Sequence, residues 1–256
     1  MGCQNSRGKI TYADPESIIN KSTSYLNFDT KTSKYLDRMA HRFSTGLQMS
    51  KRQFKAYLKV LNLQKELPST TDFFKYFYNR DTESYSVKQL STLGILLGKS
   101  KTHSKAHLLF QNYDEDCTAS LSKEEISEMI EDIFYISCDC LPGFTSRNND
   151  YEIREFIDKY RNKLKCMKKS VCNHYTRLVF YTEENESISI LEFKNVIRSI
   201  KELLDPAEFR IATQKIYDSV SKAADMVDLY MKPDNGVKPV IKEFVLGDRT
   251  ARNRIS

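Results

Sequence analysis

The chain has 256 residues, with 40 lysines and arginines against 34 aspartates and glutamates, and a formal net charge of +6. This length is enough for one or two domains with a hydrophobic core. Only 8 glycines and 6 prolines are present, so long helices are seldom interrupted. No apolar run approaches the roughly 18 residues of a membrane-spanning helix, and the N-terminus lacks the apolar stretch of a signal peptide. We therefore expect a cytoplasmic protein with long helices.

The first residues predict lipid attachment. The sequence MGCQNS fits the N-myristoylation pattern M-G-x-x-x-[ST], with Gly2 as the acceptor once Met1 is removed. Cys3 lies beside the acylated glycine and is a suitable palmitoylation site. A second acyl chain matters because one myristoyl chain gives only weak, reversible membrane binding. The alternative is a chance match, but we predict that Gly2 and Cys3 hold the chain at a membrane as a peripheral protein.

Charge is distributed unevenly. Residues 1–110 hold 18 Lys and Arg against 8 Asp and Glu, a net charge of +10, and the remainder holds 22 against 26, a net charge of −4. A basic half next to a lipid anchor favours an anionic membrane surface as partner. The alternative is ordinary solvated helix faces. Nothing pairs these charges with base-reading elements, so we expect no nucleic-acid partner.

Two early segments have the form of short loops between apolar runs, but they lack metal ligands. Phe43–Phe54 contains no carboxylate, and Asn79–Leu90 has Asp81 and Glu83 without a glutamate at its end. We therefore expect neither segment to bind Ca²⁺.

The segment Asp114–Glu125, DEDCTASLSKEE, predicts a calcium site. Oxygen-bearing residues recur at loop positions 1, 3, 5, 7, 9 and 12, namely Asp114, Asp116, Thr118, Ser120, Ser122 and Glu125. Ser120 can offer its backbone carbonyl, Ser122 can act through a water molecule, and Glu125 can bind through both oxygens. Ca²⁺ is a hard cation that takes about six to eight oxygen ligands. The alternative is an acidic surface turn that happens to carry oxygens.

Apolar residues flank this loop at helical spacing on both sides. They are Ala106, Leu109, Phe110 and Tyr113 before it, and Ile126, Met129, Ile130 and Ile133 after it. Ser122 and Glu125 also form the S-x-x-E capping box of an exiting helix. Position 6, where a sharp turn needs positive φ, is Ala119 instead of glycine. That turn costs a residue with a Cβ about 1–2 kcal/mol.

Together, the loop and its flanks closely resemble the EF-hand family. The resemblance implies an all-α fold of paired helix–loop–helix units in two lobes, and it covers about residues 30–202, with the two early segments as degraded units. Leu121, at position 8, should form a short β-bridge to a partner loop. Acylated EF-hand proteins of the neuronal-calcium-sensor and calcineurin-B-like groups are similar in plan, although the degraded loops and an extra C-terminal helix prevent assignment to either group.

The partner loop is predicted at residues 180–193. Aligned from its exiting side, Ile188 falls at position 8 and Glu192 at position 12. Tyr181, at position 1, supplies no carboxylate, although Glu183 and Asn185 could supply oxygens. We expect a metal-free loop that pairs with the calcium loop.

Between these two units the sequence predicts an insertion. Asp139–Asp150, with proline, glycine, serine and asparagine, is the best candidate for a loop. Tyr151–Leu164 has apolar residues at helical spacing and predicts an extra helix. The basic run Lys159–Lys169 either contacts lipid headgroups or an acidic partner, or forms the polar face of a core helix, which we favour.

A final helix is predicted to start at Asp205, with proline at its first position. Its apolar residues follow near-heptad spacing and either pack on the second lobe or meet a partner helix. Lys232–Gly236 should end it, before an extended segment at Lys238–Leu246 and a flexible basic tail at Arg249–Ser256.

Six cysteines in a cytoplasmic context favour free thiols over disulfides. Cys138, Cys140, Cys166, Cys172 and His174 could be assembled into a zinc-like set, but their spacings match no standard pairing. No nucleophile elbow, phosphate loop or paired-carboxylate pattern is present, so we expect no enzymatic activity.

These observations predict four parts: an acylated segment at 1–29, a degenerate EF-hand pair at 30–100, a second pair at 101–202 with an inserted helix near 151–165, and a helix and tail at 203–256. The expected function is that of a membrane-associated calcium sensor or adaptor, which binds a helix of a target protein through a calcium-responsive apolar groove. The alternative is a calcium-insensitive structural subunit of a cytoskeletal or axonemal assembly.

Overall fold

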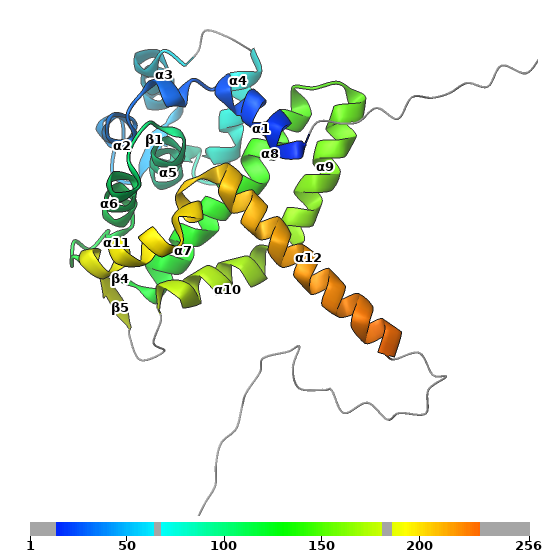
Figure 1. Cartoon of the computed structure of the whole chain (residues 1–256). Coiled ribbons are helices and arrows are strands. Elements are labelled where there is room, and N and C mark those ends of the chain that lie inside the picture. The colour runs from blue at the N-terminus through cyan, green and yellow to red at the C-terminus, as the bar shows by residue number, and fades with distance from the viewer. Residues whose placement is uncertain (1–13, 64–67, 181–185, 231–256) are drawn as a thin grey trace, which may run out of the picture. The chain divides into compact units, whose positions relative to one another are not determined.

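The computed structural model describes residues 14–63, 68–180 and 186–230, and these are mostly helical, with two small antiparallel sheets (Figure 1). The prediction of an all-α protein is therefore confirmed. The chain divides into two compact units, Met1–Tyr217 and Asp218–Ser256. The described part of the second unit is the C-terminal portion of the last helix.

In chain order, the α-helices of the described residues are α1 (Pro15–Ser24), α2 (Ser33–Arg42), α3 (Lys51–Leu61), α4 (Pro68–Phe73), α5 (Val87–Leu97), α6 (Thr102–Tyr113), α7 (Lys123–Phe134), α8 (Leu141–Arg147), α9 (Tyr151–Cys166), α10 (Lys168–Val179), α11 (Ile190–Ser199) and α12 (Pro206–Tyr230). Shorter helical turns are η1 (Phe28–Thr30), η2 (Phe74–Phe77), the π-helical η3 (Tyr135–Cys140) and η4 (Lys201–Leu204). The strands are β1 (Gln48–Ser50), β2 (Tyr78–Asn79), β3 (Ser84–Ser86), β4 (Ser120–Ser122) and β5 (Ser187–Ser189).

The two degraded loops of the first half pair with each other. β1 joins β3 in antiparallel register, with Met49 opposite Tyr85, and β2 lies on the other side of β3. Ser50 and Ser86 end these strands, and each hydroxyl accepts a hydrogen bond from the backbone of the helix that follows. Such N-caps satisfy N–H groups that have no partner inside the helix. Each of these loops therefore runs from a helical segment through a short strand into a capped helix.

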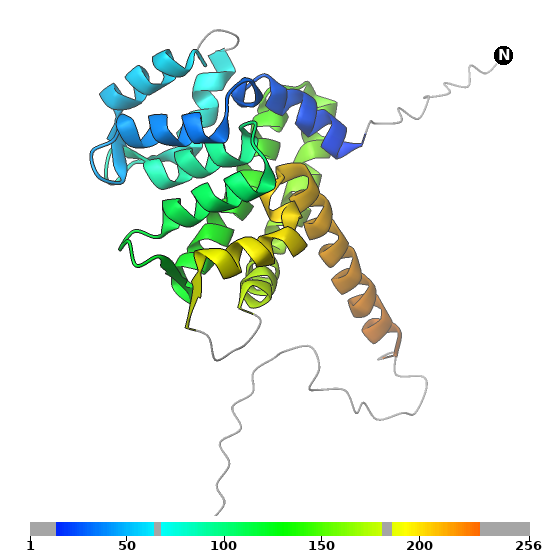
Figure 2. The ribbon, with the colours of Figure 1, turned by 60° about the vertical axis from the view of Figure 1, so that its left-hand side comes forward.

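Helices of both halves stack side by side. α2 packs on α5, α5 on α6 and α6 on α11, as the blue, green and yellow ribbons of Figure 2 show. The close approach of α2 and α5 requires Gly94, because a Cβ there would lie 2.8 Å from the Cβ of Leu36. In the second half, α7 packs on α10. The buried apolar side chains of both halves form one continuous core.

A partly buried polar network also joins the two halves. The Lys88 ammonium of α5 forms ion pairs with Glu115 and Glu128 and lies 5.1 Å from the centroid of the Tyr113 ring. Its distances to the two carboxylate oxygens of Glu128 are 3.0 and 2.9 Å. The Tyr113 hydroxyl in turn donates to Asp132 at 2.8 Å. Because charge-assisted hydrogen bonds are stronger than neutral ones, this network fixes α5 against α6 and α7.

The loop prediction for Asp139–Asp150 is wrong, because most of this stretch is helical. η3 continues α7, and α8 follows at once with Pro142 in its first turn, where a missing N–H is tolerated. Phe144 is only 2% exposed, so α8 belongs to the core. Gly143 marks a close approach, since a Cβ there would overlap the hydroxyl of Tyr76. Only three residues connect α8 to α9.

The predicted inserted helix is confirmed as α9, which packs on α8 (Figure 1). Several cations of the basic run are paired within the chain. Arg161 and Lys165 form ion pairs with Asp139, and Lys168 pairs with Glu131 at 2.7 Å. These pairs are what the polar face of a core helix is expected to show.

The predicted C-terminal helix is confirmed as α12 and starts where expected. The Asp205 carboxylate accepts hydrogen bonds from the backbone N–H groups of Ala207 at 2.9 Å and Glu208 at 3.3 Å. Phe209, in the first turn, is completely buried. The predicted helix end at Lys232–Gly236, the extended segment and the basic tail lie outside the described residues.

Candidate metal centre

The loop Asp114–Glu125 lies between α6 and α7, and both helices bury the apolar stripes predicted for them. Asp114 directly follows α6, and Ser122 directly precedes α7. Residues 115–119 are exposed. The helix–loop–helix boundaries therefore agree with those read from the sequence.

The first two aspartates of the loop accept hydrogen bonds from the backbone of the loop residues that follow them. Asp114 accepts hydrogen bonds from the backbone N–H groups of Thr118 at 2.9 Å and Ala119 at 3.2 Å. Asp116 accepts from the same N–H of Thr118 at 3.1 Å, and hydrogen bonds from Thr118 lower the pKa of Asp116. The Thr118 hydroxyl donates to the carbonyl oxygen of Ser120 at 3.0 Å. Four predicted ligand residues therefore converge on one short stretch of backbone.

The turn expected at the sixth loop position is present. Ala119 has a φ of +62°, in the left-handed region that favours glycine. Cys117, at the fourth position, also has a left-handed φ, of +56°. Cysteine is not a residue type from which this conformation would be predicted. Each such residue with a Cβ costs about 1–2 kcal/mol relative to a right-handed one. The loop is therefore strained at two positions.

Glu125 closes the loop from its exiting side. Its carboxylate accepts from the backbone N–H of Ser122 at 2.8 Å, and its own N–H donates to the Ser122 hydroxyl at 3.2 Å, which is the predicted capping box. Among the described residues, no three His, Cys, Asp or Glu side chains form a group that could hold a metal ion. The structure thus brings Asp114 and Asp116 together, whereas Glu125 is held at the helix cap.

The chemistry of these donors suits calcium, because carboxylate, hydroxyl and carbonyl oxygens are the ligands of hard cations. For Asp114 and Glu125 to share one cation, the Glu125 carboxylate must turn from Ser122 toward Asp114. Glu125 lies in the first turn of α7. A movement of its side chain is therefore coupled to the position of that helix.

The predicted partner loop pairs with this one. β4 and β5 are antiparallel, and Leu121 lies directly opposite Ile188. Both side chains are buried, so the β-bridge predicted from the eighth position of each loop is confirmed. Glu192 belongs to a second capping box, and Phe193 lies next to Phe110 with ring centroids 5.7 Å apart. The alignment of this loop from its exiting side is therefore correct.

Other predicted site residues lie outside the described residues. They are Tyr181, Glu183 and Asn185 of the partner loop, and the lipidation residues Gly2 and Cys3. Within the part of the chain that the structure describes, no helix combines the length and apolar character needed to cross a membrane.

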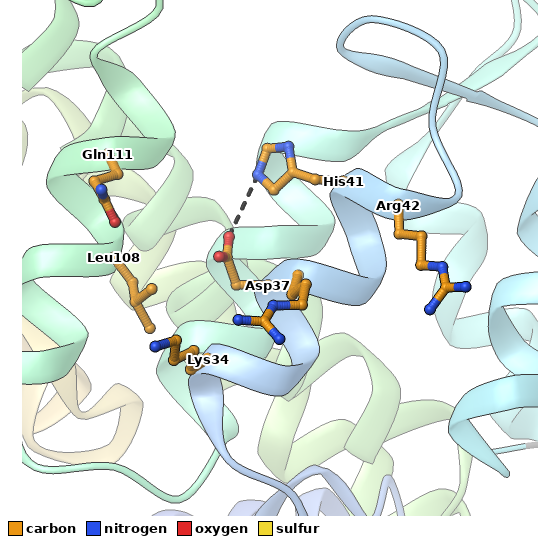
Figure 3. A pocket seen from close by; sticks show the side chains of 7 residues that line it. Lys34, Asp37, His41, Arg42, Leu108 and Gln111 are labelled. Carbon is orange, nitrogen blue, oxygen red and sulfur yellow. Dashed lines mark ion pairs between the residues drawn. The ribbon is translucent and has the colours of Figure 1, made fainter.

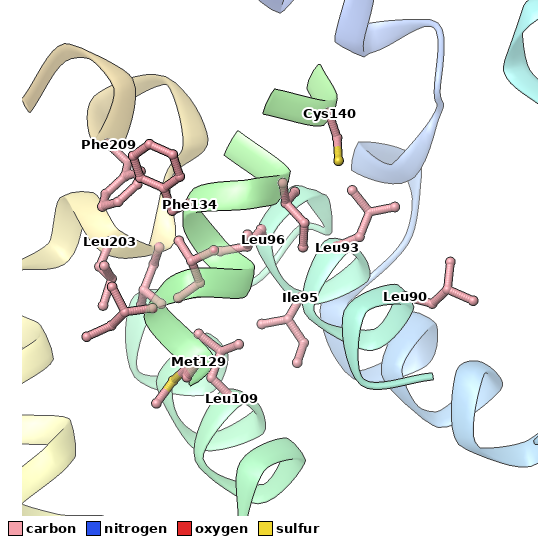
Figure 4. Close-up of a cluster of buried hydrophobic side chains, with 14 of the residues drawn as sticks. Leu90, Leu93, Ile95, Leu96, Leu109, Met129, Phe134, Cys140, Leu203 and Phe209 are labelled. Carbon is pink, nitrogen blue, oxygen red and sulfur yellow. The ribbon is translucent and has the colours of Figure 1, made fainter. Parts of the chain in front are cut away.

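Apolar side chains of η4 and α12 pack into the buried core of the second half, where Figure 4 shows Leu203 and Phe209 close to Phe134. Phe209 of α12 packs against Phe134 of α7 and Tyr175 of α10, with ring centroids 6.3 and 5.2 Å apart. Leu203 and Leu204 of η4 are also buried in this core. The start of α12 therefore packs on the second half, which is one of the two arrangements that its apolar stripe predicted.

The sequence analysis missed a contact made by two acidic residues, one in the loop and one just after it. Glu115, at the second loop position, and Glu128, one turn after Glu125, both bind the ammonium of Lys88. Their partner lies in a different helix–loop–helix segment, so no local spacing marks the contact. The sequence showed only that both residues are acidic. Acidic residues are common on exposed helix faces, so this gave no reason to expect a contact with Lys88.

The cysteines of the zinc-like set do not gather at a metal site in the described residues. Cys138, Cys140 and Cys172 are buried, whereas Cys117 and Cys166 are exposed, and all five are free thiols. Burial raises the pKa of Cys172 to about 11 and also raises the pKa values of Cys138 and Cys140. The buried thiols thus behave as small apolar side chains.

Comparison with known proteins gives one partial similarity. No protein-family model matches the chain. Over 90 residues, the chain is 30% identical to the calcium and calcium/calmodulin-dependent serine/threonine-protein kinase DMI-3 of Medicago truncatula. The matched stretch covers 35% of this chain but only 17% of the kinase. The chain is thus similar to a small part of a calcium-dependent protein, a distant resemblance that assigns it to no family.

Proposed function

We propose that this chain is an EF-hand calcium-binding protein that acts as a sensor or adaptor rather than as an enzyme. The observation that carries the proposal is the pairing of two loops through Leu121 and Ile188, with helices on both sides of each loop. The left-handed turn at Ala119 and the oxygen ligands of the same loop support it. The partial similarity to a calcium-dependent kinase points in the same direction.

In this proposal, Asp114, Asp116, Thr118 and Ser120 hold the entering side of the site, where they already share one stretch of backbone. Bound calcium supplies a centre of positive charge for these oxygens. To join these oxygens, Glu125 would have to leave the Ser122 amide, and because it lies in the first turn of α7, that movement would be coupled to the position of the helix. Rotation of an exiting helix is how paired EF-hands expose an apolar groove to a target helix.

A target helix can enter this groove only after Phe209 leaves it, because Phe209 fills the space between Phe134 and Tyr175. The sensor role therefore requires the start of α12 to be displaced. The same filled groove favours the second candidate, a calcium-insensitive structural subunit, since a permanently packed α12 would leave no room for a target.

The proposal includes peripheral attachment to a membrane through acyl groups on Gly2 and Cys3. It rests on the sequence pattern at the N-terminus and on the net charge of +10 in residues 1–110. The partners are then an anionic membrane surface and a target protein helix.

Calorimetric calcium titration of the full chain, with Glu125→Gln beside Glu124→Gln, tests the proposal. Both variants remove one negative charge from the first turn of α7, but only Glu125 is a predicted ligand. We expect one site of modest affinity, lost in Glu125→Gln and kept in Glu124→Gln. No binding by the intact chain would overturn the calcium assignment.

An apolar dye that reports exposed hydrophobic surface separates the two candidate functions. A sensor should bind more dye with calcium than without it, because Phe209 and its neighbours become exposed. For a structural subunit, dye fluorescence should be the same with and without calcium, whether or not the chain binds the ion.

A further inference from the structure

An open groove of about 510 Å³ lies between α2 and α6 (Figure 3). The residues that line it are mostly ionisable and come mainly from α2. They are Lys34, Asp37, Arg38, His41, Arg42, Leu108 and Gln111. We call this feature the α2–α6 groove, and it lies in the basic part of the chain.

Asp37, the acidic residue that lines the α2–α6 groove, has two side-chain partners within the protein. The Asp37 carboxylate accepts a hydrogen bond from the Ser91 hydroxyl at 2.6 Å and lies 3.3 Å from the ring nitrogen of His41. Contact with Asp37 raises the pKa of His41. Both contacts are made by Oδ1 of Asp37, so this carboxylate is directed toward Ser91 and His41.

The cations of the α2–α6 groove are exposed and have no acidic ion-pair partner in residues 14–63, 68–180 and 186–230. Lys34, Arg38 and Arg42 take part in none of the ion pairs found among the described residues. Against the single charge of Asp37, they leave the groove with a net charge of +2, and protonation of His41 adds one more. Figure 3 shows Lys34 near Leu108, with Arg42 farther away.

The charge of Lys34 also acts on a histidine of α6 beside the groove. The pKa of His107, on α6, is lowered by burial and by the nearby charges of Lys194 and Lys34. Its Nδ1 atom is buried and has no hydrogen-bond partner among the described residues. Lys34 belongs to α2 and Lys194 to α11, so cations from two neighbouring helices act on α6.

We propose that the α2–α6 groove binds a compact ligand carrying two or more phosphate groups, such as an inositol phosphate, either free or as the headgroup of a membrane lipid. Arg38 and Arg42 can each donate two parallel hydrogen bonds to a phosphate, and Lys34 adds a point charge. The three residues repeat every fourth position and so extend over about 12 Å of helix. That length suits several phosphate groups better than one.

The chain contains a matched control for this proposal. Lys51, Lys55 and Lys59 of α3 have the same spacing as Lys34, Arg38 and Arg42, but they do not line the α2–α6 groove. Lys55 and Lys59 are exposed, so replacing them should not disturb the fold. If anions bound only through general attraction to a basic helix, substitutions in α2 and in α3 would reduce the affinity equally.

The test compares Lys34→Gln/Arg38→Gln with Lys55→Gln/Lys59→Gln in the full chain, made without acyl groups and kept in a calcium chelator. Inositol trisphosphate binding is measured by calorimetry. Sedimentation is measured with phosphatidylcholine vesicles that contain phosphatidylinositol bisphosphate, or phosphatidylserine at equal charge. We expect the groove variant to lose at least about tenfold in affinity for the phosphorylated probes, and the α3 variant to bind like the intact chain.

Binding of both phosphorylated probes would identify a lipid headgroup as the ligand, and binding of the soluble probe alone would identify a free one. Equal losses of affinity in both variants, or binding to phosphatidylserine vesicles as strong as binding to phosphatidylinositol bisphosphate vesicles, would overturn the proposal. Circular dichroism and thermal melting should be the same for all three proteins. Because calcium and acyl groups are absent, failure here leaves the proposed calcium function untouched.

Discussion

Arg210 and Glu16 lie 194 positions apart in the sequence and form an almost completely buried ion pair. The Arg210 side chain is only 1% exposed, and its Nη2 atom lies 2.6 Å from a carboxylate oxygen of Glu16. Nη1 of Arg210 also donates to the carbonyl oxygen of Ser137 at 3.1 Å, and the Tyr160 hydroxyl donates to Glu16 at 2.7 Å. The pair therefore joins α1, η3, α9 and α12.

We predict that the losses in the free energy of unfolding caused by replacing Arg210 and Glu16 are not additive. Once one member of the pair has been replaced, replacing the other should cost less than it does in the intact protein. Arg210→Met leaves the Glu16 carboxylate buried without its cation, which should lower the free energy of unfolding by about 3–5 kcal/mol. Glu16→Gln should cost a similar amount, because the guanidinium is then the unpaired charge. Glu16→Gln/Arg210→Met should be more stable than the sum of the two losses predicts. Urea denaturation of the four proteins measures the coupling, and strictly additive losses would contradict it.

Backbone strain at Ala119 gives a second prediction. Ala119→Gly should relieve the left-handed φ and tighten calcium binding by about 1 kcal/mol, or about fivefold in the dissociation constant. Asn62 also has a left-handed φ, +54°, but it ends α3 far from the loop in sequence. Asn62→Gly should therefore leave calcium affinity unchanged. Calorimetry decides, and an unchanged dissociation constant for Ala119→Gly would show that strain does not limit binding.

Local signals in the sequence were sufficient for the paired loops of the second half and for the starts of α7 and α12. The S-x-x-E pattern located the start of α7, and position 8 of each loop located the bridge between Leu121 and Ile188. Asp205 likewise marked the start of α12. In each case the residues that decide the structure lie within a few positions of one another, so spacing alone reveals them.

The contacts that sequence analysis missed are non-local or depend on packing. Pro142 and Gly143 read as loop residues, but proline is tolerated in a first helical turn, and Gly143 lies inside α8 where the helix approaches the Tyr76 side chain. Arg210 gave no sign of a partner as distant as Glu16. Only the packed fold brings such residues together.

Thiol reactivity gives a third prediction. Cys117 and Cys166 are exposed and should react with iodoacetamide in the native protein, whereas Cys138, Cys140 and Cys172 should react only after unfolding. Burial excludes the reagent and also raises the pKa values of the three buried thiols, so little reactive thiolate forms near neutral pH. Mass spectrometry of peptides alkylated before and after denaturation locates each modified residue. Fast native labelling of Cys138 would show that the contact between η3 and α12 opens readily.

The last prediction concerns membrane residence, which the proposed function assigns to Gly2 and Cys3. In cell fractionation the intact chain should be mostly membrane-bound, Cys3→Ser should be partly released, and Gly2→Ala should be soluble. The order follows because a single acyl chain binds membranes only weakly, and because losing the myristoyl group also removes the transient contact that permits palmitoylation. Calcium affinity should be the same in all three proteins, since neither residue belongs to the loop. High salt should release the Cys3→Ser protein further, because it screens attraction between the basic half and anionic lipids. If Gly2→Ala stays with the membrane fraction, protein contacts rather than acyl groups hold the chain there, and the structural-subunit alternative gains support.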